Sequence, residues 1–486
     1  MRFLTALFCV FPALAVAQEA VNDQVNEPEI VDAGATAVAE PVQEKTEAPT
    51  AVAEPVQENA GEAKAKIQVP RELDVPFSSR VINLIGLLSM MLLAWVFSTN
   101  HKKIHWRVIG FGLLLQMGFG ALLLRSAPGR AFFDAIAKGV AALLGFYNDG
   151  AALVFGDLMK MDNVPFALSV VPTVIFFSAL MALLYHLKVM QKVVGAIAWL
   201  MRKTMKTSGA ESLSAAGNIF VGQTEAPLLV KPYINEMTQS ELMAVMVGGF
   251  ATVAGGVMVA YTSMLQGQFP DIAGHLMTAS VMSAPASLII AKLMVPEEGT
   301  PKTANSSVSS ENSTYSNVID AAAAGASDGL KLAFNMAAML IAFVALVSML
   351  NALLGLGGGL FGMPELSFQK ILGWVCSPIA WLMGVPWSEA TLVGGLIGEK
   401  TILNEFYAYN SLSQLMAAGA LSPRAIVAAT YALCGFANLG SVAIVLGGMS
   451  AIAPSRRADL ARLGIKAMIG GTLAAFMTAN VAGFLL

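Results

Sequence analysis

The most informative shortage in this 486-residue chain is charge, because only 13% of its residues are Asp, Glu, Lys or Arg. Soluble proteins carry roughly 25% charged residues, so an array of soluble domains is excluded. Hydrophobic residues make up 56% of the chain, a composition typical of polytopic membrane proteins. The formal net charge of −3 adds little, because in this class the placement of charge matters more than its sum.

Cysteine and histidine, the usual ligands of structural metals, are also scarce. The three cysteines (Cys9, Cys376 and Cys434) have the spacing of neither a disulfide framework nor a zinc site. The four histidines form no ligand cluster, and no His-Glu-x-x-His motif occurs. An intramembrane enzyme would need a nucleophile–base or metal constellation in its spans. We therefore expect a protein that is not an enzyme, has no cofactor and binds no nucleic acid.

The first residues, 1–17, predict a secretory signal peptide. Met1-Arg2 precedes an apolar run over residues 3–14, and the small-residue triplet Ala15-Val16-Ala17 follows. A charged start, an apolar core and an Ala-x-Ala site are the three parts of such a signal. An uncleaved signal anchor is the alternative interpretation.

Residues 18–72 lack aromatic side chains and are rich in Ala, Glu, Pro, Val and Gln. The nine-residue stretch 36–44 recurs as 50–58, which we interpret as the expansion of a linker. A segment of this composition cannot bury a hydrophobic core. We predict a disordered, acidic tether in the periplasm.

Eight apolar runs are long enough to cross a bilayer. They cover residues 81–99, 108–125, 165–186, 239–265, 273–295, 331–355, 424–448 and 464–486. Residues 130–158 and 366–384 are shorter apolar pieces that predict interfacial or partly buried helices. Residues 211–236 and 387–412 are polar-centred and predict re-entrant hairpins. The fold class is therefore an all-α polytopic membrane protein with eight transmembrane helices, two re-entrant helical hairpins in an inverted repeat, and an interfacial helix.

These elements divide the rest of the chain into four regions. They are a transmembrane scaffold (78–207), a first hairpin with its broken helix (208–296), a cytoplasmic loop with an amphipathic segment (297–330), and a C-terminal transport region with the second hairpin and broken helix (331–486).

The basic residues predict the orientation. They cluster after the first span (101–107), between residues 188 and 206, and between residues 456 and 466. With eight alternating spans, all three clusters fall on one side, which the positive-inside rule makes cytoplasmic. Both termini are then periplasmic, as an exported N-terminus also requires.

Two regions place polar groups at membrane depth, where a carboxylate costs several kcal/mol unless it faces a cavity, partner or ligand. The first comprises residues 217–227 and the glycine-interrupted helix around 249–257. The second comprises residues 398–406 and the interrupted helix around 434–441. Corresponding interruptions in two halves of a transporter indicate a binding site at the midplane.

The side chains of these regions suit a neutral ligand that has a planar base and a sugar. An amide such as Gln223 can pair with the edge of a base. The carboxylates of Glu225 and Glu405 suit vicinal hydroxyls and disfavour anionic substrates. In a helix Asn438 and Ser441 would share one face, and Phe436 could offer an apolar surface.

The same motifs resemble those of concentrative nucleoside transporters. The resemblance covers about residues 80–486 and rests on Gly217–Pro227, Gly398-x-Lys400-x-x-x-Asn404-Glu405-Phe406 and Gly435-Phe436-Ala437-Asn438. It implies a homotrimeric, ion-driven nucleoside symporter in the bacterial inner membrane, working by alternating access.

The resemblance also implies the roles of particular residues. Gln223 and Thr224 would contact the nucleobase, and Val257 would line its pocket. Glu225, Glu405, Asn438 and Ser441 would hold the ribose, with Phe436 nearby. A sodium ion would lie between the first hairpin and the next broken helix, bound by Asn218, Thr252 and the backbone carbonyls of Val221 and Val253.

The sequence departs from the family pattern at Tyr407, Gly256 and Gly440, which bears on base preference and on the coupling ion. Proton coupling through Glu225 or Glu405 is the alternative to sodium, although the uncharged oxygens of Asn218 and Thr252 favour sodium. A receptor or channel with an exported tether is a further alternative, which the two interrupted helices disfavour.

We expect the tether to be dispensable for transport because it lies outside the resemblance. Deletion of residues 21–67 should leave the initial rate of uridine uptake nearly unchanged at equal surface expression. A large loss of uptake would contradict the interpretation of this segment as a passive linker.

Overall fold

The computed structural model describes residues 75–160, 166–304, 308 and 315–486. The predicted signal peptide (1–17) and tether (18–72) therefore lie outside the described residues. Within the described part all regular secondary structure is helical. This confirms the all-α membrane class predicted from composition.

Each predicted span corresponds to a helix or to a pair of half-helices. Residues 81–99, 108–125 and 165–186 lie in or largely in α2 (Phe77–Val96), α3 (Trp106–Arg125) and α5 (Phe166–His186). The run 239–265 is divided into α9 (Gln239–Ala251) and α10 (Gly255–Leu265), and α11 is Ile272–Met294. The last three runs correspond to α12 (Val318–Gly359), to the pair α16 (Pro423–Leu433) and α17 (Leu439–Ile452), and to α18 (Arg457–Leu485).

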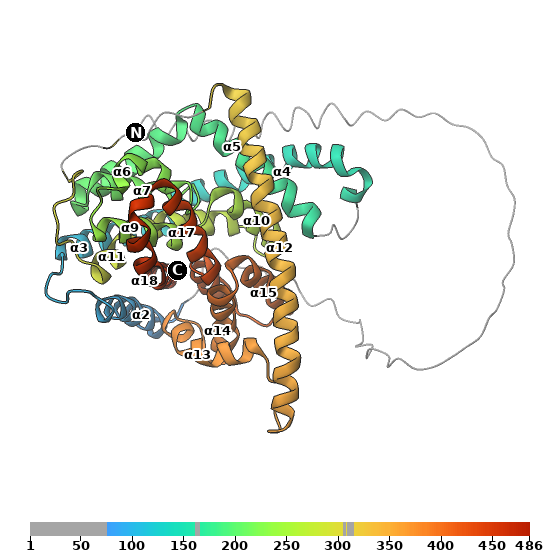
Figure 1. The fold of residues 1–486 in the computed structure, drawn as a ribbon. Coiled ribbons are helices and arrows are strands. Elements are labelled where there is room, and N and C mark those ends of the chain that lie inside the picture. Colours follow the sequence, from blue (N-terminus) through green and yellow to red (C-terminus); the bar gives the residue numbers. More distant parts are fainter. Residues whose placement is uncertain (1–74, 161–165, 305–307, 309–314) are drawn as a thin grey trace, which may run out of the picture.

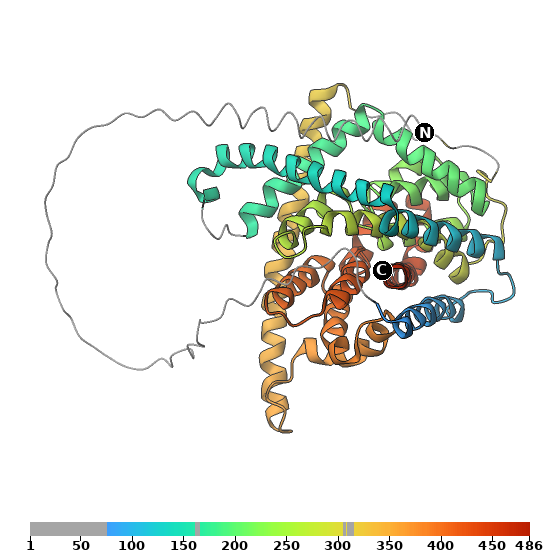
Figure 2. The same ribbon diagram turned by 180° about the vertical axis from the view of Figure 1, so that it is seen from behind.

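The count of eight spans stays a prediction, because the number depends on how two bent helix pairs are counted. Seven helices of the described part are long and apolar enough to cross a bilayer, and nine if each of two bent pairs counts as one span. The helix α4 (Ala127–Phe155), predicted to be interfacial or partly buried, lies within one of these seven helices. In both views its far end projects beyond α12 (Figures 1 and 2), while Ile136 and Val140 belong to a buried cluster with Phe177 of α5 and Ala273 of α11.

Two further helices differ from the sequence prediction. The helix α6 (Val189–Met205) forms where only a basic segment was expected, and it lies at 75° to α5. Its apolar side chains recur at helical spacing, with Arg202 and Lys203 in its last turn, so its charges obscured it in a search for spans. The helix α12 continues without a break across residues 330 and 331, where we placed a boundary.

Burial separates a central group of helices from an outer one. The most apolar windows of the pair α9–α10 and of α11 are 89% buried, whereas that of α12 is only 6% buried. Figure 1 shows α12 as a long helix that runs along one side of the central helices. Apolar side chains on such a face suit contact with lipid or with another copy of the chain. The central helices surround the polar segments.

The two halves repeat one arrangement. The first has a hairpin made of α7 (Gly209–Gly217), η2 (Ala226–Val230) and α8 (Lys231–Ile234), followed by the broken pair α9–α10. The second has α14 (Trp387–Ile402) and α15 (Glu405–Ala417), followed by the broken pair α16–α17. The helix α13 (Phe368–Leu382), predicted to be interfacial or partly buried, precedes α14 and lies at 115° to it.

The breaks of the two halves meet in the interior. Gly435 lies in the second break with φ +148°, a backbone conformation that favours glycine. A Cβ atom at this position would lie 2.7 Å from the carbonyl oxygen of Phe250, at the end of α9. Glycine therefore lets the two interrupted backbones approach each other, and the polar motifs gather around this point.

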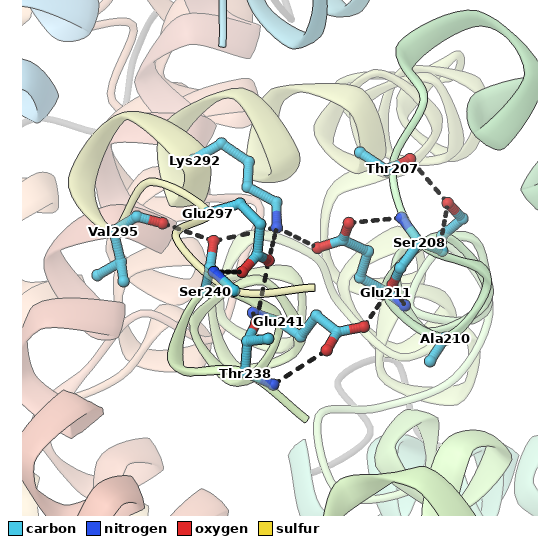
Figure 3. Close-up of polar contacts among 12 residues, drawn as sticks. Thr207, Ser208, Ala210, Glu211, Thr238, Ser240, Glu241, Lys292, Val295 and Glu297 are labelled. Atoms are coloured by element: carbon cyan, nitrogen blue, oxygen red, sulfur yellow. Dashed lines mark hydrogen bonds and ion pairs between the residues drawn. The ribbon is translucent and has the colours of Figure 1, made fainter. Parts of the chain in front are cut away.

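A buried ionic cluster anchors the base of the first hairpin, as Figure 3 shows. Ser208 and Thr238 begin α7 and α9 through capping boxes with Glu211 and Glu241, and Ser208 Oγ donates to Glu241 Oε1 at 2.6 Å. We call this the Lys292 cluster, and its members are Ser208, Glu211, Thr238, Ser240, Glu241, Lys292 and Glu297.

Lys292, on α11, supplies the positive charge of this cluster. Its Nζ lies 2.7 Å from Glu211 Oε2, 3.1 Å from Glu297 Oε2 and 3.0 Å from Ser240 Oγ (Figure 3). Only 4% of Lys292 is exposed. One ammonium and two helix N-termini thus stabilise three carboxylates that would be costly to bury alone.

We predict that Lys292→Met destabilises the protein strongly, because it leaves buried carboxylates without their cation. Breaking a buried ion pair from one side costs about 3–5 kcal/mol. Thermal unfolding of the purified protein in detergent should show a lower melting temperature. Lys302→Met is the matched control, since its ion pair with Glu236 is exposed and should contribute about 0–1 kcal/mol. Equal melting temperatures of the two variants would contradict the anchoring role of Lys292.

Candidate substrate and ion site

The first hairpin and the second broken helix are joined by a chain of polar contacts. Gln223 Nε2, at the hairpin tip, donates to Ser441 Oγ on α17 at 3.1 Å. Asn438 begins α17, and its Oδ1 accepts from the backbone N–H of Ser441 at 2.7 Å, a helix N-cap. Residues 218 positions apart in the sequence are thereby brought together. All three side chains are buried.

Glu405 is the residue through which the second hairpin takes part in these polar contacts. It is the first residue of α15, which Asn404 caps through a contact with the Tyr407 N–H. Its Oε2 accepts from Asn438 Nδ2 at 2.9 Å. Its Oε1 accepts from the Tyr261 hydroxyl at 2.9 Å. A buried carboxylate is thus hydrogen-bonded on both oxygens, as a costly buried charge requires.

Tyr261 is the site residue that the sequence analysis missed. It lies on α10 of the first half, is fully buried, and stacks on Tyr409 with ring centroids 4.5 Å apart. The signal for it is weak: a phenol in an apolar span usually has a hydrogen-bond partner, but the sequence does not say which one. Through Tyr261 the carboxylate of the second hairpin is fixed by the first half.

The remaining predicted substrate residues lie outside this hydrogen-bonded chain. The side chain of Glu225 is exposed, whereas Thr224 and Phe436 are half-buried. A Cβ atom at Gly222 would lie 2.4 Å from Glu225 Oε2, so the glycine leaves room for the carboxylate to fold back onto the hairpin. Val257 is buried on α10. Among the described residues Glu225 makes no hydrogen bond to Gln223, Glu405 or the α17 groups.

One buried acceptor of the site is unpaired. Gln223 donates through its amide nitrogen, but its Oε1 has no hydrogen-bond partner among the described residues. Leaving a buried acceptor unpaired costs about 1–3 kcal/mol. Such an atom is available to a ligand N–H, and the hydroxyl and carboxylate groups beside it are suited to ligand hydroxyls.

The predicted ion ligands gather beside the last turn of α9. Thr252 Oγ1 donates to the Gly248 carbonyl at 3.0 Å. A Cβ atom at Gly248 would lie 3.0 Å from Asn218 Nδ2, so the two predicted ligands flank the same glycine. The Gly255 N–H donates to the Phe220 carbonyl at 2.9 Å, which joins the hairpin tip to the break. The structure therefore brings these segments together.

The oxygens at this point are uncharged and in part unpaired. Asn218 is fully buried, and its Oδ1 has no hydrogen-bond partner in the described part of the chain. No backbone N–H of the described residues donates to the carbonyls of Val221 or Val253. Nor do these residues hold a group of three His, Cys, Asp or Glu side chains arranged for a metal ion. Neutral oxygens of this kind fit a weakly held monovalent cation.

A further motif, at residues 325–329, has the Gly-x-Ser-x-Gly spacing of a hydrolase nucleophile elbow. That elbow requires a sharp turn between a strand and a helix, whereas here the motif is part of the unbroken α12. A Cβ atom at Gly325 would lie 2.7 Å from the Ser178 carbonyl oxygen on α5. The glycines therefore serve close packing of two helices.

Paired hairpins and interrupted helices that bring polar groups together among apolar helices define the class of secondary membrane transporters. Family models agree with this class along most of the chain. They are the Na+ dependent nucleoside transporter N-terminus at residues 85–158, a nucleoside recognition Gate at 167–267 and the Na+ dependent nucleoside transporter C-terminus at 275–483. The chain belongs to the concentrative nucleoside transporter family.

Relatives come from bacteria and mammals. An uncharacterized transporter of Bacillus subtilis, YutK, is 45% identical over 402 residues, which cover 82% of this chain and 98% of that protein. Solute carrier family 28 member 3 of mouse is 46% identical over 414 residues, covering 82% of this chain. Sodium/nucleoside cotransporter 1 of mouse is 40% identical over 420 residues, covering 84% of this chain. The match covers 58% and 64% of these two mouse proteins, respectively.

Solved structures of the transporter CNTnw share the fold. The inward-facing, substrate-bound state has a TM-score of 0.77 at 43% identity, and covers 84% of this chain and 98% of that chain. An outward-facing variant has a TM-score of 0.78 at 43% identity, and covers 84% and 97%. Because the two states match equally well, the likeness establishes the fold and not the state of the transport cycle.

Proposed function

We propose that this protein is a sodium-driven symporter that imports nucleosides by alternating access around the central site. The observation that carries the proposal is the chain of contacts from Gln223 through Ser441 and Asn438 to Glu405, which joins the two hairpins. The names of relatives as sodium/nucleoside cotransporters support it, as does the substrate-bound state of CNTnw.

The chemistry of the site suits a nucleoside. The unpaired Oε1 of Gln223 would accept from the base, with Thr224 and the apolar Val257 beside it. Glu405 and Asn438 would give up part of their hydrogen bond to each other and bind ribose hydroxyls instead. Ser441 and the accessible Glu225 would also bind the ribose, and Phe436 would lie nearby. Because two carboxylates border the ligand, a nucleotide phosphate would be repelled.

Sodium is the coupling ion we propose, bound between the hairpin tip and the end of α9. Asn218 and Thr252 would provide side-chain oxygens, and Val221 and Val253 backbone carbonyls. The unpaired Asn218 Oδ1 supports this assignment, because a buried amide oxygen without a donor gains most from a cation. The second candidate is proton coupling through Glu225 or Glu405. Of these, Glu405 is buried, and among the described residues it forms no ion pair.

We extend the proposal to a homotrimer in the bacterial inner membrane, with both termini periplasmic. The exposed apolar face of α12 supports contact with lipid or other copies of the chain, and the three basic clusters support the orientation. The signal peptide and tether at residues 1–72 fit an exported N-terminus.

The sodium proposal predicts that uridine uptake stops when sodium is removed. Uptake into proteoliposomes should fall to background when choline replaces sodium at fixed pH, because the oxygens near Asn218 would lose their ion. Uptake that is undiminished in choline, but abolished by a protonophore, would establish the proton-coupled alternative instead.

The site predicts that Glu405→Gln and Glu225→Gln each impair uptake. Losing a hydrogen bond to a charged group costs about 1.5–3 kcal/mol, which is roughly a tenfold to hundredfold loss of rate. Initial uptake rates at matched surface expression measure the effect. Glu365→Gln is the control, because Glu365 makes an exposed ion pair with Lys370 outside the site. Uptake by Glu405→Gln at the level of this control would refute the role of Glu405.

A further inference from the structure

In each broken helix, the first half-helix ends in the protein interior, with backbone carbonyls that have no partner within the helix. The helices α9 and α16 stop at Ala251 and Leu433, in the buried centre of the protein. The last carbonyls of a helix have no donor within the helix, and they carry the negative end of its dipole. At membrane depth water cannot satisfy them, so each end needs donors or a cation.

The end of α9 is only partly satisfied. The Gly248 carbonyl accepts from Thr252 Oγ1, but no donor among the described residues reaches the carbonyls of Gly249, Phe250 or Ala251. Asn218, whose buried Oδ1 has no hydrogen-bond partner among the described residues, lies beside the same turn, with its Nδ2 nearest to Gly248. Three backbone carbonyls and one amide oxygen are thus left without a donor near this helix end, which suits a mobile cation.

The end of α16 is mostly satisfied by the protein itself, and only its last carbonyl, that of Leu433, has no donor among the described residues. Lys400 Nζ donates to the Ala432 carbonyl at 2.8 Å, and the Tyr409 hydroxyl donates to the Thr430 carbonyl at 2.8 Å. Between them, the Tyr431 carbonyl accepts from the Cys434 N–H at 3.3 Å. Three consecutive carbonyls therefore have protein donors, and one donor carries a full positive charge.

Lys400 is unusual in its surroundings. It is fully buried, and no carboxylate of the described residues lies within ion-pair distance of its Nζ. The Glu405 carboxylate acts on this ammonium electrostatically without forming an ion pair with it. An ammonium that lacks an ion pair is costly in the core of a membrane protein. Its position on the last turns of α14, five residues before Glu405, resembles that of Asn218, seven residues before Glu225. In each half, the entering arm of the hairpin thus faces the end of the following half-helix.

We propose that the Lys400 ammonium is a built-in cation, which takes in the second half the place that sodium takes in the first. The inference rests on the proposed sodium coupling and goes beyond it. The end of α9 is neutralised by an exchangeable sodium ion, and the end of α16 by the charge of a lysine side chain. At these two helix ends one sodium ion is then enough.

The test compares Lys400→Asn with Lys400→Met. Methionine fills the volume without charge or a strong acceptor, whereas asparagine adds an amide oxygen and leaves room for an ion beside the Ala432 carbonyl. Lys331→Met removes an exposed lysine and is the control. Uridine uptake into proteoliposomes and thermal unfolding of the purified protein are both measured over a range of sodium, with choline keeping ionic strength constant.

We expect Lys400→Met to lose uptake by about tenfold or more at every sodium concentration, because an essential charged hydrogen bond is gone. Lys400→Asn should recover uptake at high sodium, with a Hill coefficient that rises from about 1 towards 2 as a second ion binds. Its melting temperature should rise with sodium more than that of Lys400→Met, since a ligand stabilises the state that binds it.

Identical sodium responses of the Asn and Met variants would overturn the proposal, as would normal uptake by Lys400→Met. Failure of the proposed coupling gives a different result. In that case the parent protein would take up uridine equally in sodium and choline, while the melting temperatures of the two Lys400 variants would still report whether a cation can replace the ammonium.

Discussion

The structure depends on one constraint: backbone groups exposed by a break in a helix must find partners where no water is available. Both broken helices stop at the centre of the protein, with Gly435 of one break against the Phe250 carbonyl of the other. Donors, acceptors and charges gather there because the interrupted backbone requires them. The ends of α9 and α16 differ in how they meet this requirement, and that difference separates a place for an exchangeable ion from one occupied by Lys400.

The same constraint explains why the first hairpin has a fixed base and an adaptable tip. Its base is held by the Lys292 cluster, in which capping boxes and a buried ammonium connect α7, α9 and α11. Its tip makes single hydrogen bonds, such as Gln223 to Ser441, and keeps an unpaired acceptor. Strong buried ionic contacts resist movement, whereas single neutral hydrogen bonds are readily exchanged for bonds to a ligand. This distribution suits a segment that must bind and release its substrate.

Much of the fold could be predicted from the sequence. The apolar runs located the spans, since a bilayer imposes a length and a composition on each helix. The polar interruptions in both halves located the hairpins and broken helices. The amphipathic helix α6 could not be predicted in this way, because its basic residues lower its average hydrophobicity. The role of α4 could not be predicted either, because an apolar helix of 29 residues can lie along a membrane or cross it. The continuity of α12 could not be predicted either, because Asp320, Asp328 and Lys331 interrupt its first turns, whereas its later turns are continuously apolar.

The sequence by itself determined the membrane class, the two-half plan and the residue types of the site, because these follow from local composition and spacing. Only the tertiary structure decided which groups meet: Tyr261 with Glu405, Gln223 with Ser441, and Lys400 with the Ala432 carbonyl. Such contacts join residues far apart in the chain, and no local pattern encodes their pairing. They arise because buried polar atoms must be paired and the packing of the two halves leaves only certain partners within reach.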